Sequence, residues 1–307
     1  GPGVALKSET MGLAISLELP LVIINIQRGG PSTGLPTKTE AADLLMAMYG
    51  RHGESPMPIV AAKTPSECFF AAIEACRIAL EHRTPVMLLS DGYLANGSEP
   101  WLLPDVDGLE PINIEFDTEY NHIGEDGEAG YWPYLRDENL VRSMAIPGTP
   151  NLMHRIGGIE KEDGTGNISY DPTNHAHMVE VRAERVKRVE VPDIEVAGDP
   201  DAEILVVGWG STWGSITSAM GRVRSSGHKV AHAHLSHLNP FPKNLGEILE
   251  GRTHILVPEM NLGQLSLMLR AEYLVDAKSI SKVAGQPFTA GELEQTILEY
   301  IEGKSKS

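Results

Sequence analysis

The feature that most constrains the fold is an alternation of short apolar runs with segments of helical pattern. PLVIINIQ has the continuous apolar character of a buried strand, and a loop at 29–37 and a helix from Thr39 through Tyr49 follow it. The strand signal returns in MPIVAA and in PVMLLS. Between these two runs, Thr64-Pro65-Ser66-Glu67 has the pattern of a capping box that opens a helix ending near Glu81. Strands that alternate with helices predict right-handed crossovers and a mainly parallel sheet.

A second α/β unit follows near the end of the sequence. EILVVGWG, KVAHAHL and HILVPE predict three strands, and helical patterns at 213–226, 242–250 and 263–274 follow them in turn. A final amphipathic helix is expected at 290–302. No internal repeat or low-complexity tract interrupts the sequence, so two compact units account for its apolar runs.

Between residues 92 and 175 the pattern dissolves into Gly, Pro, Asp and Glu, which is too long for an ordinary connection. We expect an insertion or an arm that packs on another surface, with Trp101, Tyr131, Trp132 and Tyr134 as its anchors. The part from Glu99 to Gly130 contains no Lys or Arg, and a solvated surface is favoured over a cation site. A basic helix at 176–190 then leads into the second unit.

Composition excludes several classes of function. The 307 residues carry a formal net charge of −17, which would repel a phosphate backbone, so nucleic acid is not an expected ligand. No apolar run approaches the roughly 18 residues that cross a bilayer, and no signal peptide is visible, so we expect a cytoplasmic protein without membrane contacts. An iron–sulfur cluster needs about four thiolates, so Cys68 and Cys76 cannot hold one alone, and buried packing is their expected role.

The chain opens with Gly1-Pro2-Gly3 and runs at once into an imperfect helical stripe at 4–18, with no strand before it. An open α/β sheet normally begins with a strand. We therefore expect this sequence to be the C-terminal part of a longer polypeptide whose first domain starts upstream.

The strongest functional signal is the loop Gln27-Arg28-Gly29-Gly30-Pro31-Ser32-Thr33-Gly34-Leu35-Pro36-Thr37, at the end of a predicted parallel strand. In open α/β sheets, ligands bind beyond the carboxyl ends of strands. The glycines allow a close approach, the hydroxyls offer donors, and Arg28 can clamp a carboxylate with two hydrogen bonds. The alternative is a tight structural turn whose arginine pairs with a neighbouring acid.

Two other patterns suggest weaker hypotheses. Gly208-Trp209-Gly210-Ser211-Thr212-Trp213-Gly214 follows a strand and opens a helix, but KVAHAHL ends without the acid that would hold a ribose, which disfavours NAD. His232 and His234 alternate onto one strand face beside His228 and His237. No third ligand is evident, so satisfied or exposed histidines are favoured over a metal site. No serine nucleophile elbow occurs.

These motifs stand within a longer resemblance. The segment from GPGVALKSETMGLAISLELP through QRGGPSTGLPTKTEAADLLMAMYGRHGE resembles the pyrimidine-binding domain in alpha subunits of 2-oxoacid:ferredoxin oxidoreductases, nearest to those of the 2-oxoglutarate enzyme. PVMLLSDGYLANGSEPW, DPTNHAHMVEVRAERV and PEMNLGQL continue it over nearly the whole chain. The resemblance implies a partial thiamine-diphosphate pyrimidine-binding-type parallel-sheet domain at 1–98, an insertion and connecting arm at 99–190, and a transketolase-C-terminal-like α/β domain at 191–307.

The resemblance also implies an activity shared with other chains. Such enzymes decarboxylate a 2-oxoacid oxidatively, pass electrons through [4Fe-4S] clusters to ferredoxin and form an acyl-coenzyme A. Thiamine diphosphate, Mg²⁺ and the nearest cluster are expected mainly on a beta subunit, and the family glutamate that activates the thiamine lies upstream of Gly1. No GDG with a following Asn-Asn pair occurs in the sequence, which independently agrees with a diphosphate site elsewhere. No cofactor or metal is expected on this chain alone.

The resemblance and the loop together give the site expected on this chain. Arg28, Ser32 and Thr33 would bind substrate, supported by Gly29, Gly30, Gly34 and Thr37, while the catalytic residues stay open. The expected substrate is 2-oxoglutarate, with pyruvate or a branched-chain 2-oxoacid as the alternative, and a non-catalytic scaffold subunit as the alternative of a different class. Two copies of each subunit are expected. Because the chain is acidic, ferredoxin is expected to dock mostly on the partner.

Overall fold

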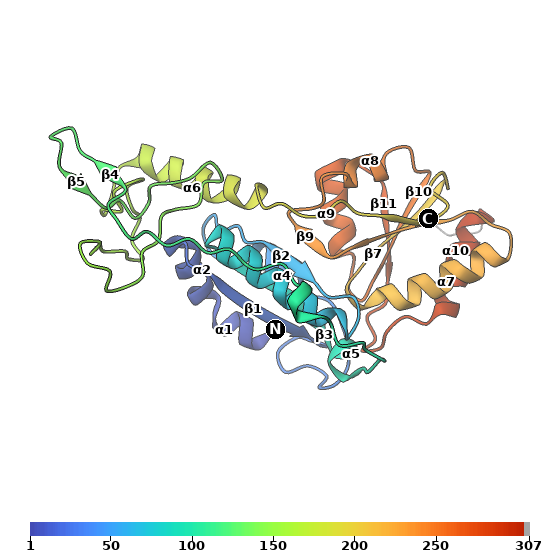
Figure 1. Cartoon of the computed structure of the whole chain (residues 1–307). Helices are drawn as coiled ribbons and strands as arrows, with labels where there is room; N and C mark the ends of the chain where they lie inside the picture. Colours follow the sequence, from blue (N-terminus) through green and yellow to red (C-terminus); the bar gives the residue numbers. More distant parts are fainter. Residues whose placement is uncertain (304–307) are drawn as a thin grey trace.

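The computed structural model describes residues 1–303, in which two twisted sheets lie side by side and a long arm projects from the first (Figure 1). The first sheet has the strand order β1-β3-β2-β9. Its strands are β1 (Leu21–Gln27), β3 (Pro85–Asp91), β2 (Ile59–Ala61) and β9 (His237–Asn239). The first three are parallel, and β9 pairs antiparallel with β2. The predicted α/β class with parallel sheets is confirmed.

Strand β1 is not the buried strand that PLVIINIQ predicted. It lies at the edge of the sheet, where Ile24 is 56% exposed and Ile26 is 47% exposed. The central strand β3 is buried along its whole length, as expected. A continuous apolar run indicates burial on both faces, and of these two strands only β3 has both faces covered within residues 1–303.

Five helices accompany the first sheet: α1 (Pro2–Leu6), α2 (Ser8–Leu17), α3 (Leu44–Tyr49), α4 (Glu67–His82) and α5 (Gly92–Asn96). The stripe predicted at 4–18 is divided at Lys7, where the backbone leaves helical geometry. The helix predicted from Thr39 begins at Leu44 instead. The side chain of Thr39 donates to Asp91 (3.1 Å), and the amide of Ala41 donates to Met260 (3.1 Å), so neither group serves a helix start.

The capping box ahead of α4 forms in part. The Thr64 hydroxyl accepts from the Glu67 amide at 3.2 Å, as the pattern predicts. The Glu67 carboxylate, however, accepts from the amide of Lys63 at 2.8 Å rather than from that of Thr64. The helix itself packs across β1, β2 and β3 and covers one face of the sheet (Figure 1).

The arm contains little regular structure, as predicted. Besides the turn η1 (Val106–Gly108), it has a hairpin of β4 (His122–Ile123) and β5 (Ala129–Gly130) that lies far from both sheets (Figure 1). Of the four expected anchors, Tyr134 is fully buried, whereas Trp101 is 43% exposed and contacts Phe69. The arm ends in α6 (Pro172–Lys187), the basic helix expected at 176–190.

A cluster of buried charges fastens the arm to the end of α2. The fully buried Glu18 accepts from Arg136 at 2.7 and 2.8 Å and also from Arg185 of α6. Arg142 and the hydroxyl of Tyr134 donate to backbone carbonyls at the same helix end, between 3.2 and 3.3 Å away. The anchor is therefore an ionic network around one carboxylate rather than a purely aromatic contact.

The second sheet has the order β11-β10-β7-β8-β6 and is parallel except for β6. Its strands are β6 (Val196–Gly198), β7 (Ile204–Trp209), β8 (Ala231–Leu235), β10 (His254–Glu259) and β11 (Ala277–Ser281). The turn η2 (Gly210–Thr212) precedes the helices, which are α7 (Trp213–Ser225), α8 (Leu245–Leu249), α9 (Gln264–Tyr273) and α10 (Ala290–Ile301). The three predicted strands are present, and β6, β9 and β11 were not predicted.

The two sheets share one apolar core, because a single cluster of buried side chains runs from α2 and β3 into β7, β10 and α10. Hydrogen bonds close the same junction. Asn261 donates to the carbonyl of Ala41 (2.8 Å), and Gln264 both donates to Ala42 (2.6 Å) and accepts from the Leu45 amide (3.0 Å). The segment after the Arg28 loop is therefore held by the second unit. Within residues 1–303, no helix is both long and apolar enough to cross a membrane.

Candidate functional site

The loop predicted as a binding site leaves the first sheet where β1 ends at Gln27. Its two ends are drawn together by hydrogen bonds from the Gly29 amide to the carbonyl of Lys38 and from the Leu35 amide to the carbonyl of Gly29, both 2.8 Å long. Gly29 and Leu35 thus form an isolated antiparallel bridge. The loop is a closed structure at the carboxyl end of the strand rather than a loose connection.

Glycine is required at position 34. Gly34 has a φ of +50°, which side chains disfavour, and a Cβ placed there would collide with the backbone of Gly29. Ser32 and Thr37 also adopt the left-handed conformation, with φ of 56° and 64°. Non-glycine residues in this region are uncommon and occur at functional sites more than elsewhere, so the loop is a strained and specified structure.

Arg28 projects from the base of the loop as an exposed side chain. Within residues 1–303 its guanidinium makes no hydrogen bond and no ion pair. The tight turn of the alternative hypothesis is present, but the ion pair with a neighbouring acid is not observed within the described residues. A planar cation with five free donors remains at a strand end, where a carboxylate can be bound through two parallel hydrogen bonds.

A cavity of about 440 Å³ lies beside this cation. Of the seven residues predicted for the site, Arg28, Thr33 and Thr37 line it, while Ser32, Gly29, Gly30 and Gly34 do not. The opposite wall consists of residues 92, 95 and 96, which follow β3. The side chain of Asp91 fixes that wall, because it accepts from the amides of Tyr93 (2.8 Å) and Leu94 (3.2 Å).

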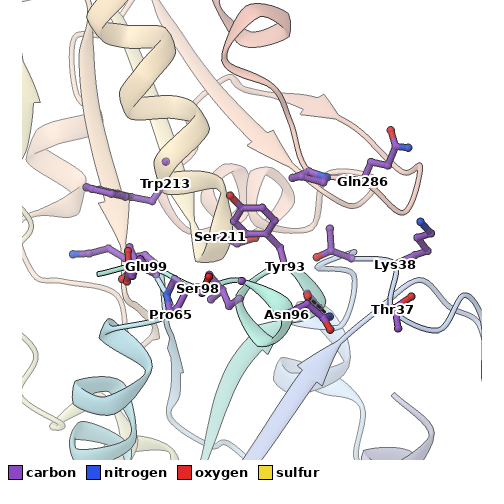
Figure 2. A pocket seen from close by; sticks show the side chains of 18 of the residues that line it. Thr37, Lys38, Pro65, Tyr93, Asn96, Ser98, Glu99, Ser211, Trp213 and Gln286 are labelled. Atoms are coloured by element: carbon purple, nitrogen blue, oxygen red, sulfur yellow. Dashed lines mark hydrogen bonds between the residues drawn. The ribbon is translucent and has the colours of Figure 1, made fainter. Parts of the chain in front are cut away.

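A larger cavity of about 550 Å³ adjoins the first and shares Thr37, Gly92 and Asn96 with it. It lies between the two units. Figure 2 shows Tyr93, Asn96 and Glu99 facing it from the first unit and Ser211, Trp213 and Gln286 from the second. None of these residues was assigned to the site from sequence. The signal that could have found them was the pair of Gly-containing turns after PVMLLS and EILVVGWG, at the carboxyl ends of two further strands.

The histidines of the second unit differ from the expectation that they are satisfied or exposed. His232 and His234 are enclosed beside a cavity of about 470 Å³, and His232 Nε2 and His234 Nδ1 have no hydrogen-bond partner within residues 1–303. Burial, with a smaller contribution from Lys63, lowers the pKa of His232 to about 4, so its ring is neutral at pH 7. His237 fits the expectation, since its Nε2 lies 3.0 Å from Glu74, and His234 fits it in part, since its Nε2 lies 3.1 Å from the Gly210 carbonyl oxygen.

The potential metal ligands do not converge. Among residues 1–303, no three side chains of His, Cys, Asp or Glu are arranged to hold a metal ion. Cys68 and Cys76 both lie on α4 as free thiols, and they are half-buried rather than fully buried as predicted. Burial raises the pKa of the Cys68 thiol, which makes it less reactive than an exposed cysteine.

Comparison with known protein families matches both units. Residues 1–169 match the family described as pyruvate flavodoxin/ferredoxin oxidoreductase, thiamine diphosphate-binding. Residues 202–293 match core domain II of pyruvate:ferredoxin oxidoreductase. The arm up to residue 169 thus falls within the first match.

Individual relatives agree with these families. The 2-oxoglutarate oxidoreductase subunit KorA of Mycobacterium tuberculosis is 54% identical over 99% of this chain and 46% of its own length. Subunit alpha of the 2-oxoacid:ferredoxin oxidoreductase 2 of Aeropyrum pernix is 33% identical, over 98% and 47%. The chain therefore spans about half the length of these curated relatives.

Among solved structures, the chain is similar to 2-oxoglutarate:ferredoxin oxidoreductase from Magnetococcus marinus, determined with 2-oxoglutarate, coenzyme A and succinyl-CoA bound. The TM-score is 0.91 at 34% identity, and the match covers 98% of this chain and 52% of that one. The two sheets and their junction are thus a shared architecture.

Proposed function

The chain belongs to the pyruvate flavodoxin/ferredoxin oxidoreductase family, and from that premise we propose that it is the alpha subunit, or part of it, of an enzyme that oxidatively decarboxylates 2-oxoglutarate. The products are an acyl-coenzyme A and reduced ferredoxin. The similarity to a relative named for 2-oxoglutarate, at 54% identity, supports this substrate over pyruvate or a branched-chain 2-oxoacid.

One observation supports a working site over a scaffold whose pocket has lapsed. The exposed Arg28 has no partner within residues 1–303, and the loop that carries it contains two strained non-glycine residues. A scaffold has no need for a free cation at the mouth of a 440 Å³ cavity or for a loop that costs free energy to fold. We assign Arg28 to a carboxylate of the 2-oxoacid, with Thr33 and Ser32 as neutral donors and residues 29, 30, 34 and 37 as the support.

The metal-binding side chains of this chain are relevant to the proposed place of the cofactors. Two cysteines on one helix cannot hold a [4Fe-4S] cluster, and the described acids form no three-ligand group for Mg²⁺. Thiamine diphosphate, when bound, supplies the carbon centre that adds to the 2-oxo group and retains the electrons left by carbon dioxide. We propose that a beta subunit holds its diphosphate, the Mg²⁺ and the cluster, while this chain lines the pyrimidine side.

The residues of this chain would bind and orient the 2-oxoacid. The Arg28 fork would fix the plane of one substrate carboxylate, which places the 2-oxo carbon in a defined direction from the loop. Gly29 supports the loop from below, because its amide and carbonyl close the loop onto Lys38 and Leu35. Two copies of each subunit form the proposed complex, and ferredoxin docks mostly on the partner, because an acidic chain would not steer an acidic protein.

The test is to co-express the chain, carrying any upstream segment of its own gene, with its partner. Reduction of a viologen dye is measured with coenzyme A and each of 2-oxoglutarate, pyruvate and a branched-chain 2-oxoacid. The proposal expects coenzyme A-dependent reduction with 2-oxoglutarate as the best substrate. Loss of that rate when this chain is omitted supports a contribution to the reaction, whereas an equal rate from the partner alone would leave this chain only a scaffold.

A further inference from the structure

The second sheet contains a crevice to which the proposed function assigns no residue. From β7 the chain passes through α7 to β8 on one side, while β10 lies on the other side of β7. The strand order therefore reverses at the carboxyl end of β7. In open α/β sheets such a switch point is where ligands bind, and the 550 Å³ cavity opens there.

The turn at this point has the construction of an anion site. Gly210 has a φ of +58°, and α7 begins after it with no side chain capping its first turn, although the amide of Trp213 donates to the carbonyl of Gly210. A 13-residue helix without a side-chain cap, whose first residues Trp213 and Gly214 line the cavity, presents partial positive charge toward it. The Nε2 of the enclosed His234 donates to the Gly210 carbonyl at 3.1 Å, which fixes the turn from the side of the sheet.

A second, independent observation indicates a missing ligand. Ser211 is 5% exposed and lines the cavity, yet its Oγ has no hydrogen-bond partner within residues 1–303 (Figure 2). A buried hydroxyl without a partner is unfavourable, and an acceptor bound in the cavity would satisfy it.

The charges around the cavity suit an anion. Lys38 has no ion pair within residues 1–303, and Lys63 contributes a second cation although it lies 3.0 Å from Glu67. The acid on the wall, Glu99, already accepts from the amide of Ser66 at 2.6 Å and from its hydroxyl. Because β8 ends without an acid for a ribose, a dinucleotide is not favoured.

We propose that this cleft binds the phosphate group of a small anion, between the Ser211 turn and Lys38. The site is separate from the Arg28 loop, although the two cavities meet at Thr37. The phosphate could belong to inorganic phosphate or to a phosphate monoester, and Tyr93 and Trp213 provide aromatic walls for the remainder of the latter.

The test measures binding rather than activity. The co-expressed complex is saturated with thiamine diphosphate and Mg²⁺, so that the diphosphate site is filled, and is dialysed to equilibrium against radiolabelled inorganic phosphate. One saturable site per copy of this chain is expected. Ser211→Ala should weaken binding about 10-fold, because one hydrogen bond to a charged group is lost. Lys38→Ala should also weaken it.

Two variants serve as controls. Ser225→Ala removes a hydroxyl that bonds only within α7, to Gly221 at 2.8 Å, so binding should not change. Arg28→Ala should leave phosphate binding intact. The proposal is overturned if no saturable phosphate binds, if Ser211→Ala binds as tightly as the unmodified chain, or if Arg28→Ala abolishes binding. Competition by adenosine 5′-phosphate identifies the source, since displacement below the inorganic phosphate concentration indicates a monoester and failure to displace indicates free phosphate.

Discussion

Replacement of Arg28 is the most direct test of the proposed substrate site. Within residues 1–303 the guanidinium contacts no acid, so Arg28→Ala breaks no bond that stabilises the fold. The change in unfolding free energy should therefore stay within about 0.5 kcal/mol, as for ordinary surface positions. Any loss of activity then reports on the substrate and not on folding.

The expected loss of activity follows from the substrate carboxylate that Arg28→Ala would leave without its partner. Removing one partner of a desolvated, charge-assisted contact costs about 2 to 5 kcal/mol. The lower bound corresponds to roughly 30-fold in kcat/KM. Arg28→Lys keeps the charge but loses the planar fork, so its loss should be smaller.

The assay is viologen reduction by the assembled complex with 2-oxoglutarate and with pyruvate. A loss with both substrates indicates that Arg28 binds the carboxylate they share, and a loss confined to 2-oxoglutarate indicates the distal one. Arg155→Ala is the matched control, because Arg155 is also exposed and unpaired within residues 1–303 but lies on the arm. If Arg28→Ala keeps kcat/KM within about twofold for every substrate while the complex stays assembled and keeps its thiamine diphosphate, the clamp is refuted.

Three further predictions concern the surrounding structure. Gly34→Ala drives a Cβ into the Gly29 backbone and should lower kcat/KM as Arg28→Ala does. Gly221→Ala is the control and should leave kcat/KM unchanged, because there is open space around Gly221. Steady-state kinetics of both variants measure the difference. Glu18→Gln leaves the buried Arg185 without a carboxylate and leaves Arg136 with Asp163 alone, so it should lower the unfolding free energy in urea by about 3 to 5 kcal/mol. Burial alone would raise the pKa of Glu18, but Arg185 and Arg136 together lower it below the ordinary 4.5. The stabilisation by Glu18 is therefore complete above about pH 4.5 and is lost as the pH falls through the folded pKa. Urea titrations that show equal stability of the unmodified chain at pH 7 and at a pH below the folded pKa would contradict the network. Gln264→Ala removes two hydrogen bonds across the junction and should cost about 1 to 3 kcal/mol, while the exposed Gln295→Ala should cost almost nothing, which the same urea titration compares.

The strands whose conformation depends on residues adjacent in the sequence were predicted from the sequence. β3 and β10 were predicted because the centre of each run is apolar, and all but His254 of these residues are buried in the structure. β9 and β11 were missed because His237–Asn239 has three residues and Ala277–Ser281 buries only one side chain. In both, the partner strand specifies the conformation more than the local pattern does.

The arm contains buried charges to which the sequence assigned no role. Arg142, Lys161 and Arg185 are all among the most buried side chains of the described residues. Glu18 compensates Arg185 from 167 positions away, and no local window contains both residues. Burial of such a group follows from a tertiary pairing that periodicity does not encode.

For the candidate site, the sequence predicted the Arg28 loop but not the cavity between Tyr93 and Ser211. The Gly-rich turn after β1 is a local pattern with a known meaning at a strand end. The cavity that joins Tyr93 to Ser211 needs strand ends more than 100 positions apart to meet, and the bonds from Asn261 and Gln264 that bring them together are invisible in either segment alone.

Strand β9 has a consequence for how the molecule can be divided. It comes from the later part of the chain but pairs with β2, and so covers an edge of the first sheet. A truncation after α6 would leave Ile59–Ala61 as an open edge with unpaired amides and carbonyls beside a fully buried apolar strand. Such an edge is a template for pairing between molecules. A protein expressed from residues 1–190 should therefore aggregate, and the two units are better regarded as one cooperative structure than as separable modules.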